Sequence, residues 1–201
     1  VDTILLEDDF TLTGGKTILD NLGCLCDEHL RLLSERLGEN VMRDKLLPYL
    51  TEGKSNKYRE EYLRLMGETL LKIAGDIEKA VHSVAPDTRI GFSSNSASYH
   101  LEGASAFQIA ETLAGKNKPF VRLTAAPYWK NGPSLNSTIE TARMQCAWFT
   151  ERGTDVMTEG DTYPRPRFLV SAAELEMYDM ILRADGNSTG ILKYMLDSNS
   201  F

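Results

Sequence analysis

The sequence lacks the features that mark several classes of protein. No stretch approaches the roughly 18 consecutive apolar residues of a membrane-spanning helix. Its 22 basic residues are outnumbered by 29 acidic ones, and no run of five like charges occurs. A basic stripe for nucleic acid or for an anionic membrane is therefore missing. We expect neither nucleic acid nor a membrane as a partner.

Cysteine, histidine and the common nucleotide or nucleophile motifs are also scarce or missing. The three cysteines cannot all pair, which favours a reducing compartment and predicts a cytoplasmic protein. The sequence holds no GxSxG nucleophile elbow, no phosphate-binding lysine loop and no GxGxxG. Serine hydrolases of the common type, ATPases and dinucleotide-binding enzymes are therefore disfavoured.

What is present fits one ordinary globular domain. The chain has 201 residues, of which 42% are hydrophobic and 25% charged, which suffices for one sizeable core. We predict a single domain over residues 1–201. Because the sequence opens at Val1 and turns apolar within a few residues, we also expect a piece of a longer gene.

Short apolar or β-branched runs alternate with longer helical patterns, which indicates an α/β fold of parallel (β/α) repeats. The last four runs begin 31, 35 and 36 residues apart, about one strand, one helix and two loops. Such repeats suit a doubly wound sheet or part of a barrel. A complete barrel takes roughly 250 residues, so we predict a TIM-barrel-like partial barrel or a fragment of a longer chain. The five predicted strands are residues 3–7, 88–92, 119–123, 154–158 and 190–196.

A helical and loop insertion over about residues 11–86 separates the first two predicted strands. It holds a short helix at 27–37 and a long amphipathic one at 56–84. Between them, Pro48 and Gly53 predict a segment rich in turns at 38–55. Shorter helices are predicted at 102–114, 135–152 and 170–184, and Trp148 of the second is placed in the core.

The predicted strands end in polar and acidic residues, where (β/α) proteins carry their chemistry. Carboxylates on separate strands beside aromatic side chains suit a carbohydrate site, in which one acid protonates the glycosidic oxygen while the other attacks or activates water. Two alternatives stay open. The carboxylates can cap helices, or Glu7, Asp8, Asp9 and Glu159 can bind a divalent metal for isomerase or aldolase-type chemistry.

A second candidate site lies at Cys24, Cys26 and His29. Two thiolates and an imidazole at this spacing are ligands for tetrahedral zinc. Cys146 completes the set only if the fold brings it close. The alternative is that these cysteines are small apolar core residues.

The sequence resembles family 42 β-galactosidases at both candidate sites. Asp8-Asp9-Phe10 followed by Cys24-Leu25-Cys26-Asp27-Glu28-His29 is similar to the end of the fourth barrel strand in that family, where Asn-Glu-aromatic precedes Cys-x-Cys-x-x-Cys. Residues 156–164, with Glu159, resemble the end of the seventh strand, which carries the nucleophilic glutamate. The resemblance covers most of the chain as strands four to eight.

The resemblance implies a retaining mechanism with Glu159 as nucleophile and Asp9 as general acid/base, and no cofactor for catalysis. It also implies a structural zinc ion held by Cys24, Cys26 and His29, in which His29 stands in place of the family's third cysteine. Asp9 is one methylene shorter than the family glutamate. The residues expected to bind the sugar are Asp8, Asn95, Arg122, Tyr128, Trp129 and Asp161.

Two function hypotheses follow. The first is a β-galactosidase-like glycoside hydrolase that cleaves a glycosidic bond through two carboxylates. The alternative is a non-catalytic carbohydrate-binding or assembly domain with barrel architecture. Because a partial barrel leaves two strand edges open, both predict that a second copy of the chain or the missing portion of the barrel covers those edges.

Overall fold

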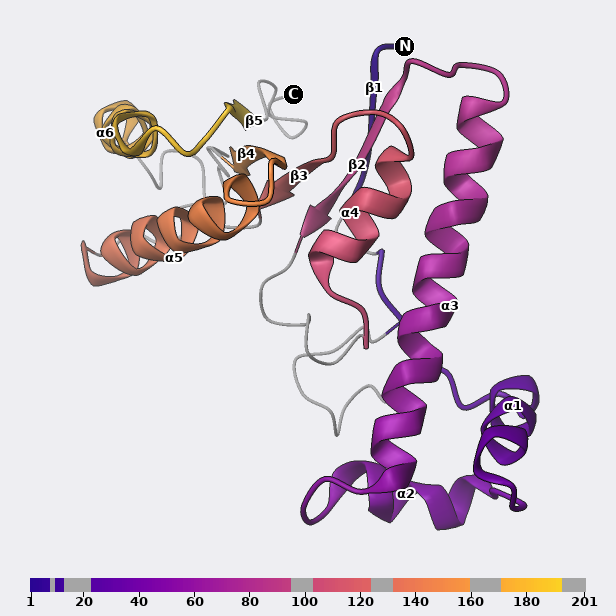
Figure 1. The fold of residues 1–201 in the computed structure, drawn as a ribbon. Helices are drawn as coiled ribbons and strands as arrows, with labels where there is room; N and C mark the ends of the chain where they lie inside the picture. Colours follow the sequence, from indigo (N-terminus) through magenta and orange to yellow (C-terminus); the bar gives the residue numbers. More distant parts are fainter. Residues whose placement is uncertain (8–9, 13–22, 95–102, 124–131, 160–170, 193–201) are drawn as a thin grey trace, which may run out of the picture. The chain divides into compact units, whose positions relative to one another are not determined.

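A computed structural model describes residues 1–7, 10–12, 23–94, 103–123, 132–159 and 171–192 (Figure 1). The chain divides into two compact units. The sheet unit comprises Val1–Asp8, Asp87–Ser96 and Lys116–Phe201, and the helical unit comprises Asp9–Pro86 and Ala97–Gly115. No helix in the described part of the chain has the length and apolarity needed to span a membrane.

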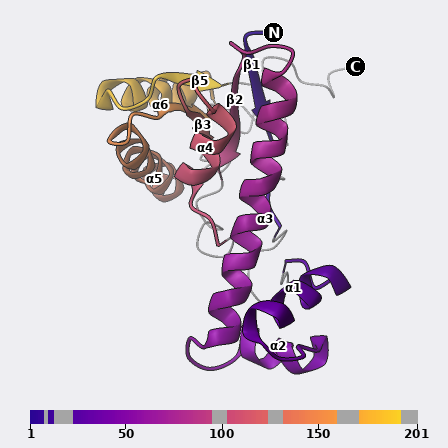
Figure 2. The ribbon, with the colours of Figure 1, turned by 45° about the vertical axis from the view of Figure 1, so that its right-hand side comes forward.

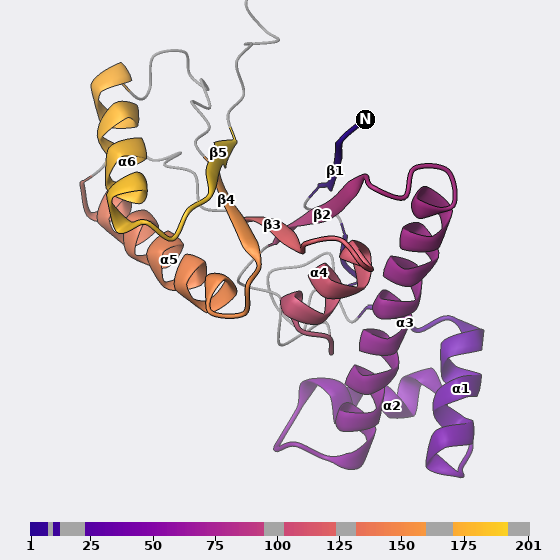
Figure 3. The same ribbon diagram turned by 45° about the horizontal axis from the view of Figure 1, so that its top comes forward.

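The sheet unit is built on five parallel strands that follow one another in chain order (Figure 3). A doubly wound sheet reverses its strand order at a switch point, whereas a barrel keeps consecutive strands adjacent. The described fold is therefore an α/β arrangement like part of a TIM barrel, as predicted. The strands are β1 (Thr3–Leu6), β2 (Arg89–Ser94), β3 (Phe120–Leu123), β4 (Asp155–Glu159) and β5 (Gly190–Leu192).

Helices α5 (Gly132–Thr150) and α6 (Ala172–Asp185) complete the sheet unit. α5 packs against β3, β4 and α6. A small apolar cluster joins the two helices through Ile139 and Ala142 of α5 and Tyr178 and Leu182 of α6. Trp148 of α5 is 47% exposed, so its placement in the core is wrong. The buried face of α5 is taken instead by residues such as Cys146 and Phe149.

One face of the sheet has a close contact that requires glycine. Gly91 of β2 packs against Phe120 of β3. A Cβ at Gly91 would lie 2.5 Å from the carbonyl oxygen of Phe120 and 2.7 Å from two of its ring carbons. The guanidinium of Arg89 lies 5.0 Å from the centre of the same ring. Phe120 is thus buried by its neighbours on the adjacent strand, and the small residue at 91 makes room for it.

The helical unit contains α1 (Asp27–Leu37), α2 (Arg43–Thr51), α3 (Lys57–His82) and α4 (Ala106–Ala114). Figure 2 shows α3 as one long helix with α1 and α2 beside its N-terminal half. α3 begins where the side chain of Asn56 accepts hydrogen bonds from the backbone N–H groups of Tyr58 and Arg59. Leu33, Leu46, Leu50 and Met66 form part of the core between these helices.

α4 follows a segment that lies very close to α3. A Cβ at Gly67 of α3 would lie 2.2 Å from the carbonyl oxygen of Gly103, and one at Gly103 would lie 1.8 Å from that of Leu63. α4 then starts in a capping box, in which Ser105 and Gln108 satisfy each other's backbone N–H groups. Two glycines therefore set how closely these backbones approach.

Helix α2 contradicts the turn-rich segment predicted at residues 38–55. Pro48 lies inside this helix, although proline removes a backbone donor and disfavours a helix interior. Leu46 and Leu50 are 1% and 2% exposed and lie on one face at a spacing of four. Burial of this leucine pair stabilises the helix against the local preference of proline.

Candidate functional site

The carboxyl ends of four parallel strands converge on the side chain of Arg122. Arg122 belongs to β3 and is aligned with Ser93 of β2 and with Met157 of β4. Because side chains alternate between the two faces of a strand, Glu159 lies on the same face as Met157, two residues further along β4. Glu7 follows the last residue of β1. The register thus brings the polar ends of β1, β2 and β4 to one guanidinium.

Two carboxylates and one hydroxyl of the described residues lie at contact distance from that guanidinium. Nη1 of Arg122 lies 2.9 Å from Oε1 of Glu159, and Nη2 lies 2.9 Å from Oε2 of Glu7. Nε donates a hydrogen bond of 2.9 Å to the hydroxyl of Ser93. The side chains of Arg122 and Glu159 are each 3% exposed, whereas that of Glu7 is 58% exposed. Arg122 and Glu159 form a buried ion pair, and Glu7 adds a second carboxylate from the solvent side.

This arrangement holds the carboxylate of Glu159 beside the guanidinium of Arg122. A guanidinium at ion-pair distance stabilises the ionised form of a carboxylate and restricts its rotamers. Burial, and after it the negative charge of Glu159, raises the pKa of Tyr178 on α6. The phenol of Tyr178 therefore stays protonated near neutral pH. The arrangement places a buried carboxylate, ion-paired with Arg122, at the end of a barrel-type strand.

The structure describes only some of the residues predicted for this site. It brings together Glu159, the predicted nucleophile, and Arg122, a predicted sugar-binding residue. Among the described residues, Arg122 contacts Glu7, Ser93 and Glu159. The other predicted residues lie outside the described part of the chain: Asp8, Asp9, Asn95, Tyr128, Trp129 and Asp161.

Sequence reasoning did not include Ser93, Tyr178 or a role for Glu7 beside Arg122 in this site. Ser93 and Glu7 do stand at predicted strand ends, which is a usable signal. Their convergence on Arg122 depends on the register between strands, which the sequence does not specify. Tyr178 lies on a helix far along the chain, and no local pattern connects it with Glu159.

The second candidate site belongs to the helical unit, where Cys24, Cys26 and His29 come together as predicted. One ligand atom from each lies within 4.8 Å of the others. Sγ of Cys26 lies 3.3 Å from Nδ1 of His29. Tetrahedral zinc, with bonds of about 2.3 Å to sulfur and about 2.0 Å to nitrogen, separates two sulfur ligands by about 3.8 Å and a sulfur from a nitrogen by about 3.5 Å. Both separations lie within the 4.8 Å that spans the three ligand atoms. The three residues therefore fit a zinc ion as three of its four ligands.

The surroundings of this cluster also suit metal binding. Nε2 of His29 lies 3.2 Å from Oγ1 of Thr69, which itself donates to the carbonyl of Leu65. Nε2 therefore carries the proton, and the lone pair of Nδ1 points toward the cysteines. The backbone N–H of His29, at the start of α1, is the main cause of a lowered pKa for Cys26. Although a hydrogen bond from the backbone of Cys26 lowers the pKa of Cys24, burial and the neighbouring Cys26 side chain outweigh it, and that pKa is raised. Outside the cluster, burial raises the pKa of Cys146 to about 12.

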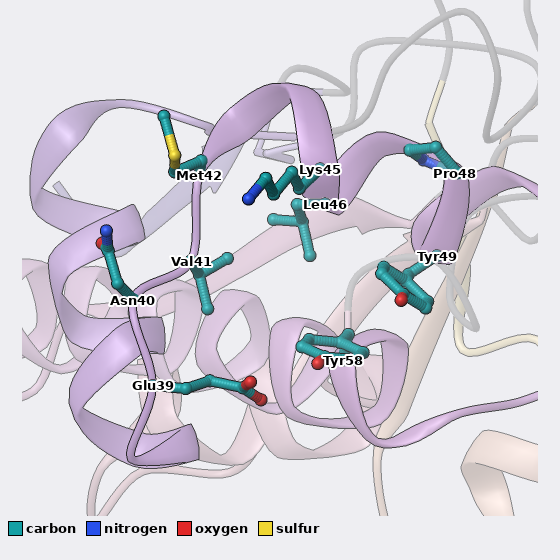
Figure 4. A pocket seen from close by; sticks show the side chains of 9 residues that line it. All are labelled: Glu39, Asn40, Val41, Met42, Lys45, Leu46, Pro48, Tyr49 and Tyr58. Carbon is teal, nitrogen blue, oxygen red and sulfur yellow. The ribbon is translucent and has the colours of Figure 1, made fainter.

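A pocket of about 440 Å³ lies in the helical unit between the segment before α2 and the start of α3. In Figure 4 the carboxylate of Glu39 points toward Tyr58. Lys57 donates to this carboxylate at 2.6 Å, and Tyr49 stacks on Tyr58 at 4.3 Å between ring centres. Hydrogen bonds from Lys57 and Tyr58 lower the pKa of Glu39. Glu39 thus ties the segment before α2 to the start of α3, and the stacked rings of Tyr49 and Tyr58 hold α2 against α3.

Comparison of the chain with protein-family models, curated proteins and solved structures finds no match.

Proposed function

We propose that the chain carries the acid site of a retaining glycoside hydrolase with β-galactosidase-like specificity. The observation that carries the proposal is the ion pair of Glu159 with Arg122 at the carboxyl ends of barrel-type strands. A retaining enzyme needs a carboxylate that is ionised and fixed before it attacks the anomeric carbon. In this proposal Glu159 is that nucleophile, and Arg122 positions it.

The second carboxyl group of the proposed mechanism is Asp9. It first protonates the glycosidic oxygen as the sugar bonds to Glu159, and it then takes a proton from the water that releases the sugar. This role comes from the resemblance of Asp8-Asp9-Phe10 to the fourth-strand motif. Asp8, Asn95, Tyr128, Trp129 and Asp161 are proposed to line the sugar pocket.

The proposal is tested with aryl glycosides and two variants, each changed at a carboxylate that pairs with Arg122. Glu159→Gln keeps the size of the side chain but removes the nucleophile, and we expect at least about a 10³-fold loss of kcat. Glu7→Gln removes the other carboxylate beside Arg122 and should change kcat less than about tenfold. Thermal unfolding of both variants checks that they fold.

Two outcomes would overturn the proposal that the chain is a glycoside hydrolase. Turnover at the wild-type rate by Glu159→Gln excludes this residue as nucleophile. A wild-type chain that binds galactosides in calorimetry but hydrolyses none of them supports the alternative, a non-catalytic carbohydrate-binding domain.

We also propose that Cys24, Cys26 and His29 hold a structural zinc ion. The support is the separation of their ligand atoms and the contact of His29 with Thr69. A zinc ion there would tie the segment before α1 to α3, because Thr69 lies on α3. The proposed hydrolysis uses no metal.

A further inference from the structure

Helix α6 carries an exposed apolar stripe beside its buried face. Met177 and Met180 are 42% and 62% exposed, and Ala173 and Ala184 are exposed as well. Their spacings of four, three and four residues are those of a helix that packs along a second helix. At about 100° per residue these four positions fall within about 60° of arc. The buried residues Tyr178 and Leu182 lie on another side of the helix.

The charges beside this stripe are suited to a second copy of the same helix. Glu176 and Arg183 flank the stripe on one side, and both are exposed. They are seven residues apart, which is too far for an ion pair within one helix. If two copies of α6 pack antiparallel, Glu176 of each copy lies opposite Arg183 of the other. In a parallel pair, Glu176 would instead lie opposite Ile181.

The same antiparallel register matches the sizes of the apolar side chains. It places Met177 of one copy against Met180 of the other, and Ala173 against Ala184, twice each. The small alanine layers let the helix ends approach, while the flexible methionines fill the centre. Ion pairs and apolar layers are therefore satisfied by one two-fold axis, which is the condition for a closed symmetric dimer.

We propose that the protein self-associates through α6 as an antiparallel, two-fold symmetric dimer. The contact is one pair of helices, each about 21 Å long at 1.5 Å per residue for 14 residues. So small an interface belongs to the weak class. We expect reversible association with a dissociation constant of about 10⁻⁵ to 10⁻³ M.

Sedimentation velocity of the whole chain over about 10⁻⁶ to 10⁻³ M measures this equilibrium. Met177→Glu places two unpaired carboxylates, one from each copy, in the apolar centre of the proposed dimer and should weaken association at least about tenfold. Met144→Glu makes the same change at an exposed methionine of α5, 47% exposed, and serves as the matched control. Both sites are exposed, so thermal unfolding of the two variants should stay near that of the wild type.

A charge exchange tests the register itself. Glu176→Arg and Arg183→Glu each place like charges opposite one another in both symmetric contacts and should weaken association about threefold to tenfold. The double variant E176R/R183E restores opposite charges and should return the wild-type constant.

Three outcomes overturn the proposal. A chain that is monomeric throughout the concentration range excludes the dimer. A dimer unaffected by Met177→Glu excludes this face. Failure of the double variant to recover excludes the antiparallel register.

Discussion

A buried arginine is stable only where nearby protein groups balance its charge and accept hydrogen bonds from its N–H groups. The charge of Arg122 is balanced by the carboxylates of Glu7 and Glu159, and its Nε donates to the hydroxyl of Ser93. Removal of one of these partners would leave a charge uncompensated in the interior. The geometry of Glu159 therefore depends on β3 as much as on its own strand.

A second ion-pair group, at the opposite end of the strands, predicts a pH dependence of stability. Asp155 of β4 binds Lys118 at 2.5 Å and Arg89 at 2.8 Å. Burial raises the pKa of Asp155, but the hydrogen bonds and charges of Lys118 and Arg89 outweigh it, and the pKa lies below its usual value. Because the folded-state pKa is the lower one, this group stabilises the protein above the unfolded pKa of about 3.9. That stabilisation is lost as the pH falls through the folded pKa.

We expect Asp155→Asn to lower the free energy of unfolding by about 1 to 2 kcal/mol at neutral pH. The difference from wild type should shrink as the pH falls below about 4. Urea unfolding at several pH values measures both. Asp76→Asn is the control, because Asp76 pairs with Lys72 on an exposed surface and should change stability little at any pH. An equal effect at both sites, or a pH-independent one at Asp155, would contradict the assignment.

The cysteine cluster gives a prediction that does not depend on activity. We expect the purified chain to hold about one zinc ion per molecule and Cys26→Ser to lose most of it. Zinc analysis by mass spectrometry and the melting temperature with and without a chelator measure the effect. Cys146→Ala changes a cysteine outside the cluster and should leave the zinc content unchanged. A wild-type chain without zinc affinity would exclude the site.

At the scale of secondary-structure elements, tight backbone contacts decide what each helix tolerates. α3 contains two glycines in different surroundings. A Cβ at Gly67 would meet backbone atoms of Gly103 and Ala104 at 2.2 and 2.9 Å, whereas one at Gly75 would meet only a methyl of Thr112 at 3.7 Å. Backbone atoms cannot move aside as a flexible side chain can, so the two positions should respond oppositely to alanine.

We expect Gly67→Ala to destabilise the protein by about 2 kcal/mol or more, because the overlap exceeds the gain in helix propensity. Gly75→Ala should be neutral or stabilise it by up to about 1 kcal/mol. Urea unfolding of the two variants measures the difference. Equal stabilities would mean that the segment at Gly103 does not contact α3 as described.

Most elements could be located from the sequence, because their patterns are local. The predicted helix at 27–37 coincides with α1, and each predicted strand overlaps an observed one. The predictions from sequence were wrong where tertiary packing outweighed the local conformational preference of a residue. Leu46 and Leu50 hold α2 together despite Pro48, and Trp148 lies on the exposed side of α5 while Cys146 and Phe149 are buried.

At the scale of the whole molecule, the order of the strands in the sheet identifies the type of fold. Consecutive parallel pairing distinguishes a barrel-type sheet from a doubly wound one, and repeat spacing alone left both possible. The pairing also decides which strand ends share a face. The sequence could place Glu159 and Arg122 at strand ends, whereas the contacts of Arg122 with Glu7, Ser93 and Glu159 depend on the register.

Covalent trapping of the nucleophile examines the proposed role of Glu159 without reliance on a loss of activity. An aryl galactoside with fluorine beside the anomeric carbon slows breakdown of the glycosyl-enzyme, so a retaining enzyme accumulates it. Mass spectrometry of the digested protein then locates the added sugar. We predict one fluorogalactosyl group per chain, on Glu159, and none on the Glu159→Gln variant. A label on another carboxylate, or hydrolysis of aryl galactosides without any label on Glu159, would contradict the account.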